Sequence, residues 1–140
     1  SSAASDVYKR QERKSFHDYV DQFKIKCQED QLMVNLSGGN QQKILVARAL
    51  MTNCKVLILL EPTRGIDVGA KVQMHQIIHN FAEKGLAVIV VSSDLPEVIN
   101  LSDRVMVMCN GESMGFLEGD DINEDSIMLK AAGFKDGSAK

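Results

Sequence analysis

The 140-residue sequence lacks an excess of positive charge and lacks any long apolar run. Its 16 Lys and Arg are outnumbered by 19 Asp and Glu, whereas a nucleic-acid-binding protein normally presents a basic face, so no nucleic-acid partner is expected. No uninterrupted apolar stretch approaches the roughly 18 residues that a membrane helix needs, so we expect the chain to reach a membrane only through a partner. The hydrophobic content of 44% is ordinary for a globular chain that buries a core.

The sequence also lacks the cysteine and histidine spacing of a disulfide framework or a zinc site. Cys27, Cys54 and Cys109 are an odd number and far apart, with no CxxC pair, which indicates buried free thiols in a reducing cytosol. His75 and His79 are spaced i, i+4 and could in principle share a metal on one helix face. No third ligand is evident, so we interpret them as part of a solvated polar face and assign no metal ligand.

The first part of the chain has the pattern of helices. In "SFHDYVDQF" the apolar residues recur at helical spacing, and Ser15 and Asp18 are spaced like a helix cap, which predicts a helix that begins at Ser15. Further on, "LSGGNQQKILVARAL" predicts a second helix with Ser37 as its N-cap.

After Met51 strands and helices alternate. The segments "KVLILL" and "LAVIVV" are apolar on both faces and flank the helical "GAKVQMHQIIHNFAEKG", which predicts a buried parallel βαβ unit with a right-handed crossover. A short helix near Pro96 follows. Asn110-Gly111 in "RVMVMCNGESMGFL" is the strongest hairpin signal in the chain, and the methionines around it are expected on the packed face. "INEDSIMLKAAG" predicts a final short helix, and the fold class is α/β.

Two stretches have residues suited to chemistry on phosphate. Glu61 ends the strand "KVLILL", and the carboxyl ends of parallel strands are where open α/β sheets place their sites. Taken alone, Glu61 is simply a polar residue that begins a loop. Gly38 and Gly39 follow Ser37 at the start of a helix, where bare amides and the helix dipole favour an anion. Taken alone, they form an ordinary glycine turn.

Together, "LSGGNQQK", "EPTRGIDVGAK" and "VIVVSSDLPEV", in that order, resemble the ATP-binding cassette (ABC) ATPases. The resemblance covers roughly Ser15 to Gly133 and is strongest to the second cassette of two-cassette ATPases that power monosaccharide importers of the ribose, galactose and xylose type. It implies the C-terminal part of a P-loop ABC ATPase domain: a helical subdomain segment at the N-terminus, a parallel βαβ core, and a C-terminal β-hairpin plus helix.

The resemblance also implies how the chain is divided. Residues 12–51 correspond to the helical subdomain and signature helix, and residues 52–140 to the part from the Walker B strand to the C-terminal end. "SDVYKRQ" fits no part of the family pattern, so residues 1–11 are interpreted as a non-native or disordered leader. We expect the earlier strands and the phosphate loop to lie upstream of a truncated start.

By the same resemblance, the ATP site is composite. The signature residues Ser37, Gly38, Gly39 and Asn40 lie in trans at the γ-phosphate of ATP held by the facing cassette. A hydroxyl, bare amides and a helix dipole suit phosphoryl transfer, which needs positioning and charge stabilisation more than covalent chemistry.

Three further positions carry roles in the family. Glu61 is the catalytic carboxylate that orients or deprotonates the attacking water. Asp67 belongs to the loop that crosses the dimer interface, and its alternative role is the N-cap of the next helix. Ser93 occupies the switch position. Arg64 could approach phosphate in trans, but a surface arginine before a turn is the simpler interpretation.

The chain departs from the family pattern in ways that affect the site. Leu60 stands where an aspartate usually helps to hold Mg²⁺, and leucine has no lone pair. Ser93 replaces the usual histidine, a change familiar in second cassettes of sugar importers. The chain has no GxxxxGK[ST] motif and no glutamine loop. We therefore expect that this chain alone is inactive.

The expected function is that of a partial ATP-binding and ATP-hydrolysing subunit of an importer of simple sugars. Its cofactors are ATP and Mg²⁺ in the assembled composite site. Its partners are a second nucleotide-binding domain, a membrane permease and, indirectly, a sugar-binding protein, at the cytoplasmic face of the plasma membrane. The alternative is a non-hydrolysing regulatory or docking domain that only assembles the dimer interface.

Overall fold

A computed structural model of the chain describes residues 2–28, 30–52 and 54–134, and their side chains from Asp6 onward. Residue 1 of the predicted leader and residues 135–140 of the predicted cassette segment lie outside the described residues. The chain divides into two compact units, one up to Val91 and one from Ser92 on.

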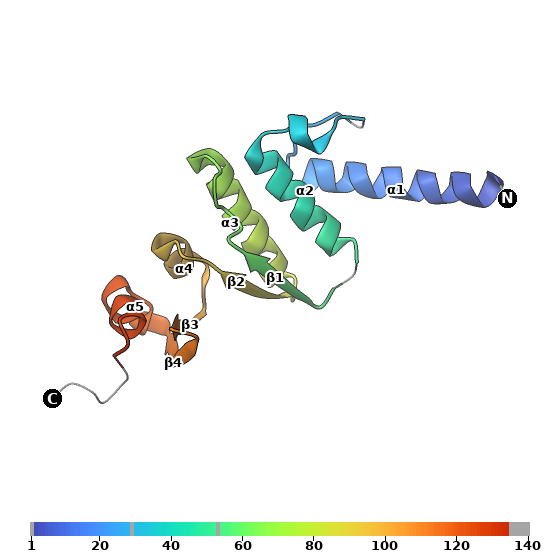
Figure 1. Cartoon of the computed structure of the whole chain (residues 1–140). Helices are drawn as coiled ribbons and strands as arrows, with labels where there is room; N and C mark the ends of the chain where they lie inside the picture. The colour runs from blue at the N-terminus through green and yellow to red at the C-terminus, as the bar shows by residue number, and fades with distance from the viewer. Residues whose placement is uncertain (1, 29, 53, 135–140) are drawn as a thin grey trace. The chain divides into compact units, whose positions relative to one another are not determined.

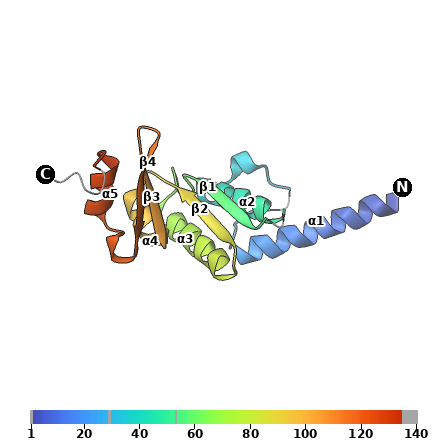
Figure 2. The same ribbon diagram turned by 90° about the horizontal axis from the view of Figure 1, so that it is seen from below.

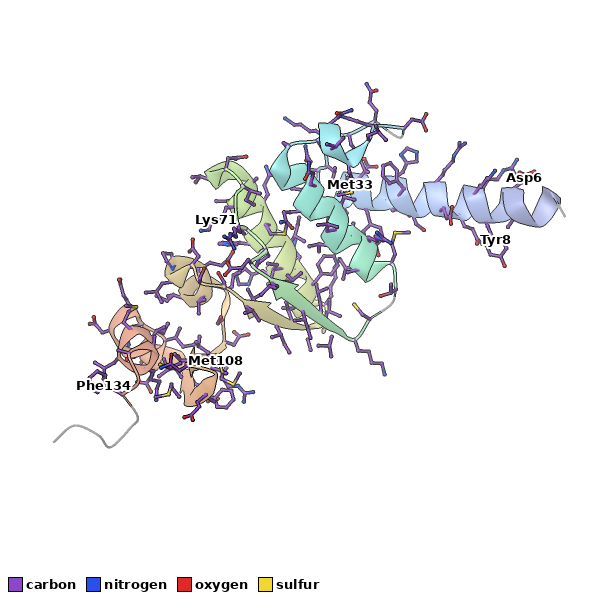
Figure 3. The ribbon with its side chains drawn as sticks, viewed as in Figure 1. Asp6, Tyr8, Met33, Lys71, Met108 and Phe134 are labelled. Atoms are coloured by element: carbon purple, nitrogen blue, oxygen red, sulfur yellow. The ribbon has the colours of Figure 1, made fainter. Side chains whose placement is uncertain are left out.

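The first unit begins with a long helix, α1, which runs from Ser2–Gln22 (Figure 2). The prediction that this helix begins at Ser15 with a cap there is wrong, because the helix continues through Ser15 without a break. The residues before Ser15 include good helix formers such as Lys, Arg, Gln and Glu, so a polar helix extends past the apolar stripe. Figure 3 shows Asp6 and Tyr8 on this exposed part.

Residues 2–11 are helical in the structure, and their interpretation as a non-native or disordered leader stays a prediction. The side chains of residues 6–14 are all exposed. Packing begins near the end of α1, where the rings of Tyr19 and Phe23 lie 5.6 Å apart between centroids. Phe23 is buried and meets Phe81 edge-to-face at 5.6 Å.

The rest of the first unit is a βαβ unit preceded by a helix. Its elements are η1 (Met33–Asn35), α2 (Gly38–Leu50), β1 (Val56–Leu60), α3 (Val68–Glu83) and β2 (Ala87–Val91). The strands β1 and β2 are parallel, with Val56 opposite Ala87 and Leu60 opposite Val91. This confirms the predicted parallel βαβ unit. Helix α3 contacts both α2 and β2 (Figure 1).

The two faces of the β1–β2 sheet differ. Leu57 and Leu59 are buried on one face, and α3 contributes its own buried residues, including Met74. On the opposite face the five large apolar residues are 49% to 74% exposed: Val56, Ile58, Leu60, Ile89 and Val91. The prediction that both strands are buried on both faces is therefore wrong for this chain. One crossover helix covers only one face of a sheet, which leaves the apolar residues of the other face exposed.

The second unit is a hairpin packed against two helices. Its elements are α4 (Leu95–Leu101), β3 (Arg104–Cys109), β4 (Glu112–Glu118), η2 (Gly119–Asp121) and α5 (Glu124–Ala131). Asn110 and Gly111 connect β3 to β4 with φ of 50° and 81°, the positive values that a two-residue type I′ turn requires. The predicted hairpin and the predicted final helix are both confirmed.

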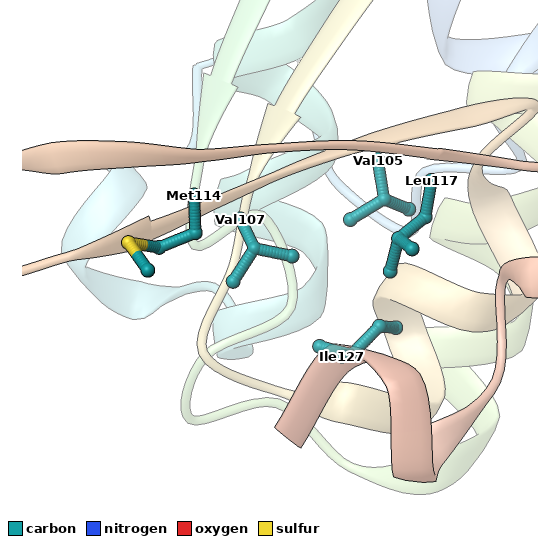
Figure 4. Packing of buried hydrophobic residues seen from close by; sticks show 5 residues of the cluster. All are labelled: Val105, Val107, Met114, Leu117 and Ile127. Carbon is teal, nitrogen blue, oxygen red and sulfur yellow. The ribbon is translucent and has the colours of Figure 1, made fainter. Parts of the chain in front are cut away.

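A small apolar cluster holds this unit together. Figure 4 shows its five buried residues, Val105, Val107, Met114, Leu117 and Ile127. They come from β3, β4 and α5, so the final helix closes the core of the hairpin. Met106 and Met108 are each 51% exposed, so the prediction of a packed methionine face holds for Met114 alone. Strand alternation explains this, because residues 105 and 107 face the core.

The three cysteines and the lengths of the helices bear on disulfide bonds and membrane spans. Cys27, Cys54 and Cys109 are free and half-buried, so they are less buried than predicted. Burial raises the pKa of the Cys27 thiol. Within the described residues, no helix is both long and apolar enough to cross a bilayer.

Candidate functional site

The signature turn, residues 37–40, begins helix α2 as the sequence predicts. Ser37 has the extended backbone of an N-cap, with φ of −60° and ψ of 151°, and its Oγ accepts a hydrogen bond from the Asn40 amide at 3.4 Å. The Ser37 carbonyl accepts the first helical bond, from the Gln41 amide at 2.9 Å. Gly38 and Gly39 are the first two helical residues, whose amides have no acceptor inside a helix. These two donors are what the turn can offer to an anion.

The two glycines have different surroundings. Gly39 is buried, and a Cβ placed on it would lie 2.5 Å from Cβ of Ala70, at the start of α3. Gly38 is exposed, and a Cβ there would meet its nearest neighbours, Gly65 O and Ile66 Cγ2, at an ordinary 3.6 Å. Gly39 is therefore required for the close approach of α2 and α3. Sequence reasoning missed this role, since the contact depends on a residue 31 positions away.

Asn40 and Gln41 tie the preceding loop to the helix. The Asn40 side chain donates to the Lys26 carbonyl and accepts from the Lys26 amide, both at 3.3 Å. The Gln41 side chain donates to the carbonyls of Met33 and Leu36, each at 3.0 Å. The Asn40 side chain thus already has partners in its own chain, a structural role that the sequence analysis did not assign to it.

Lys43 is a buried cation one turn farther along α2. Its side chain is almost fully enclosed, at 3% exposure, and its ammonium donates to the Lys24 carbonyl at 3.4 Å and to Oε1 of Gln73. Burial lowers the pKa of the Lys43 ammonium, Lys24 and Lys26 lower it further, and Asp67 acts in the opposite direction. The sequence shows a lysine within the helix α2 but does not show that this lysine is buried against other elements.

Glu61 lies at the end of β1, where the sequence places it. Its amide donates to the Val91 carbonyl at 2.7 Å, and its carbonyl accepts from the Arg64 amide at 3.2 Å. Its φ of 48° is in the left-handed region, which is uncommon for a residue with a side chain. Strained backbone of this kind persists where the surroundings hold it, and such strain clusters at functional sites.

Leu60, the residue before Glu61, is 74% exposed on the open face of the sheet, beside Val91 of β2. Because successive strand residues point to opposite faces, Leu60 shares its face with Ile58 and Val56. The Leu60 side chain therefore adds to the apolar surface at the position where the aspartate usual in the family would offer an oxygen ligand to Mg²⁺.

Asp67 caps the next helix. Its Oδ1 accepts a hydrogen bond from the Ala70 amide at 2.9 Å, so the alternative role considered for Asp67, N-cap of α3, is present in the structure. Whether it also crosses a dimer interface stays a prediction. Arg64 is exposed in the turn after Glu61, as expected for a surface arginine.

Ser93 belongs to the second unit, between β2 and α4. It is exposed. The neighbouring Asp94 caps α4, accepting from the Glu97 amide at 2.9 Å, while the Asp94 amide donates to Ser92 Oγ at 3.0 Å. These hydrogen bonds of Ser92 and Asp94 help to fix the turn that contains Ser93.

Oxygen ligands for a metal are sparse near Glu61. In the part of the chain that the structure describes, no group of three His, Cys, Asp or Glu side chains is placed to hold a metal ion. Mg²⁺ prefers octahedral coordination by oxygen atoms, and Leu60 offers none. The residues of this chain do not by themselves fit the Mg²⁺ that the family resemblance implies.

The chain is similar to known proteins over most of its length. The family model of the ABC transporter matches residues 2–64. A Pseudomonas syringae pv. syringae (strain B728a) protein, described as a ribose/galactose/methyl galactoside import ATP-binding protein, is 58% identical over 106 residues, which are 76% of this chain and 20% of that protein. The xylose import ATP-binding protein XylG of Moorella thermoacetica is 48% identical over 118 residues, which are 84% of this chain and 23% of that protein.

A solved structure agrees in fold. The nucleotide-free ATP-binding cassette from an ABC transporter matches with a TM-score of 0.71 and 26% identity, over 79% of this chain and 43% of that chain. The fold and the signature turn define an ATP-binding cassette. The chain belongs to the ABC transporter family as part of an ATPase domain, homologous to import ATP-binding proteins for ribose, galactose and xylose.

The chain spans only 20% to 23% of the length of these two relatives. The family match begins at residue 2, inside the segment interpreted as a leader. The limits of the leader and of the two cassette segments, 12–51 and 52–140, stay predictions.

Proposed function

We propose that the chain is part of an ATP-hydrolysing subunit of an importer of simple sugars, and that its signature turn completes an ATP site in trans on a second cassette. The observation that carries the proposal is the exposed start of α2. Ser37 and Gly38 are exposed there, and the first amides of the helix need an acceptor from outside it. A terminal phosphate supplies both the acceptor and the negative charge that the helix dipole favours.

The other site residues have separate roles. Glu61 orients or deprotonates the attacking water of the half site on its own cassette, and its backbone is fixed by the bond to Val91. Asp67 links the two half sites, and Ser93 stands at the switch position. ATP is the substrate. Mg²⁺ bound with ATP would neutralise phosphate charge, and its ligands would have to come from residues other than Leu60.

The partners follow from this role. A second nucleotide-binding domain holds the ATP that the signature turn contacts, a membrane permease couples hydrolysis to transport, and a sugar-binding protein acts indirectly through the permease. The subunit is peripheral, at the cytoplasmic face of the plasma membrane. The xylose and ribose/galactose import relatives support sugar as the cargo.

One observation favours a second candidate, a non-hydrolysing regulatory or docking domain. Leu60 removes an expected metal-supporting carboxylate and leaves an apolar surface instead. Such a domain would use the signature turn only to assemble a dimer interface, so ATP turnover would not depend on Ser37.

The test uses an XylG chimera, in which the matched residues of Moorella XylG are replaced by those of this chain. We expect the XylG chimera to hydrolyse ATP and Ser37→Arg to abolish hydrolysis, because the arginine fills the space of the terminal phosphate. Lys55→Met, an exposed change before β1, is the control. Full ATP turnover by Ser37→Arg would reject the proposal and favour the docking domain.

A further inference from the structure

We propose that Lys43 is a positioning residue that holds the signature turn in register with the N-terminus of α3, where Asp67 lies. The inference rests on the proposed function, because it assigns Lys43 a role in presenting that turn to a nucleotide. Lys43 does not contact the nucleotide in this account. It acts by fixing the position of α2 relative to α3.

The first support is the set of segments that Lys43 joins. Its ammonium donates to the Lys24 carbonyl, in the segment after α1, and to the Gln73 side chain on α3. The Lys43 side chain thus connects α2 both to the segment after α1 and to α3. Lys43 is 3% exposed and both hydrogen bonds are partly buried, so water competes only in part for the ammonium.

The second support is a neighbouring contact on the same two helices. Gly39 precedes Lys43 by one turn of α2, and Ala70 precedes Gln73 by about one turn of α3. A Cβ on Gly39 would lie only 2.5 Å from Cβ of Ala70, so the two helices approach each other closely there. A single contact lets one helix pivot on the other. Two contacts one turn apart fix the rotation as well.

The third support is the nature of the group that is buried. A buried ammonium that bonds to neutral acceptors loses its hydration, and an apolar side chain of the same length would avoid that loss. Stability alone therefore does not favour a lysine at this position. A lysine is favoured there if its directional hydrogen bonds select one arrangement of α2, α3 and the segment after α1.

The same contacts bring together the two loops that the proposed function assigns to the composite site. Ser37 caps α2 two residues before Gly39, and Asp67 caps α3 three residues before Ala70. Asp67 also favours the charged form of Lys43. Losing the Lys43 contact therefore changes the relative place of both caps, even though neither cap is itself altered.

The experiment measures kcat and KM for ATP in the XylG chimera with Lys43→Met, Gln73→Leu and the double variant. Displacement of a site residue by about 1 Å costs up to about 100-fold in rate, so we expect each single variant to lower kcat between about 10- and 100-fold. KM should change less, because the facing cassette binds the nucleotide. The double variant should be no slower than the slower single variant, since Gln73→Leu removes a hydrogen bond that Lys43→Met already removes.

Two controls separate positioning from general damage. Gln76→Leu makes the same chemical change on α3, but the side chain of Gln76 donates to Asn80 on its own helix, so kcat should stay within about twofold. Lys43→Arg keeps a cationic donor and should recover most of the kcat lost in Lys43→Met. Gln73 is exposed, so Gln73→Leu keeps the test decisive even if Lys43→Met does not fold.

Ser37→Arg, measured in parallel, separates failure of the positioning role of Lys43 from failure of the proposed function. If Ser37→Arg abolishes turnover while Lys43→Met and Gln73→Leu leave kcat unchanged, the positioning role is overturned and the proposed function stands. Losses that multiply in the double variant overturn it as well. If Ser37→Arg leaves turnover unchanged, the proposed function fails, and the inference fails with it.

Discussion

The signature turn and the end of β1 both contain motifs of the family. The two regions differ in the contacts that hold them and in how completely they match the family pattern. The turn is held by a cap, by the Gly39–Ala70 contact and by the side chains of Asn40 and Lys43. At the end of β1, Glu61 is held by its backbone, but its neighbour Leu60 is an exposed leucine. Under the proposed function, this difference means that the chain contributes more to the ATP site of the second cassette than to its own.

The largest effect is expected at the cap of the turn. Ser37→Asp keeps an N-cap acceptor for α2, but its carboxylate repels a terminal phosphate. We expect ATP turnover by the XylG chimera to fall at least about 100-fold, as when an oxyanion donor is removed, with an unchanged midpoint of thermal unfolding. Ser37→Thr, which keeps the hydroxyl, is the control. Ser37→Asp with more than half of the starting turnover would remove the contrast between the two regions.

The two glycines of the turn give the next effect. Gly39→Ala forces a methyl group against Ala70, so we expect it to lower the free energy of unfolding of the chimera by about 1–3 kcal/mol. Gly38→Ala is the matched control, because its methyl group has room, and its effect on stability should stay within about 0.5 kcal/mol. Urea unfolding measures both. Equal effects of the two alanines would mean that the α2–α3 contact is not as close as described.

A smaller effect is expected at Asn40. Asn40→Ala removes both bonds to the Lys26 backbone, which should lower the free energy of unfolding by about 1 kcal/mol, since each such bond contributes modestly. Asn40→Asp still accepts from the Lys26 amide and should lose less. If Asn40→Ala left stability unchanged but abolished ATP turnover, Asn40 would act on the nucleotide and not on the loop.

The smallest effect is expected at the strand end. A restored supporting metal ligand in a site that limits turnover would change activity about 10- to 100-fold. Because the proposed function places Leu60 in a different half site from the one that the signature turn completes, Leu60→Asp should change the ATP turnover of the chimera by less than that. Leu60→Asn, similar in size and uncharged, controls for loss of apolar surface. A large gain from Leu60→Asp alone would show that the strand end limits the reaction.

The sequence predicted the parts of the fold whose signals are local. The cap at Ser37, the Asn110-Gly111 turn and the alternation of strand, helix and strand each depend on neighbouring residues, and the structure confirms them. The start of α1 was wrong because a run of polar helix formers extends the helix without an apolar stripe. The open face of the sheet was wrong because an apolar strand pattern does not specify what covers it.

The site was predictable only in part for the same reason. Ser37, Gly38 and Glu61 could be selected because their motifs are contiguous. The packing role of Gly39 depends on Ala70, and the role of Lys43 depends on Gln73, and both partners lie about 30 residues farther along the chain. Contacts between separate elements require the tertiary structure.

The most direct measurement is hydrogen–deuterium exchange at the Gly38 and Gly39 amides of the XylG chimera, with and without ATP. The account predicts that ATP slows exchange at these two amides, and that Ser37→Arg abolishes the protection while exchange along the rest of α2 stays unchanged. Exchange at both amides that is the same with and without ATP would contradict the claim that this turn contacts a partner's nucleotide.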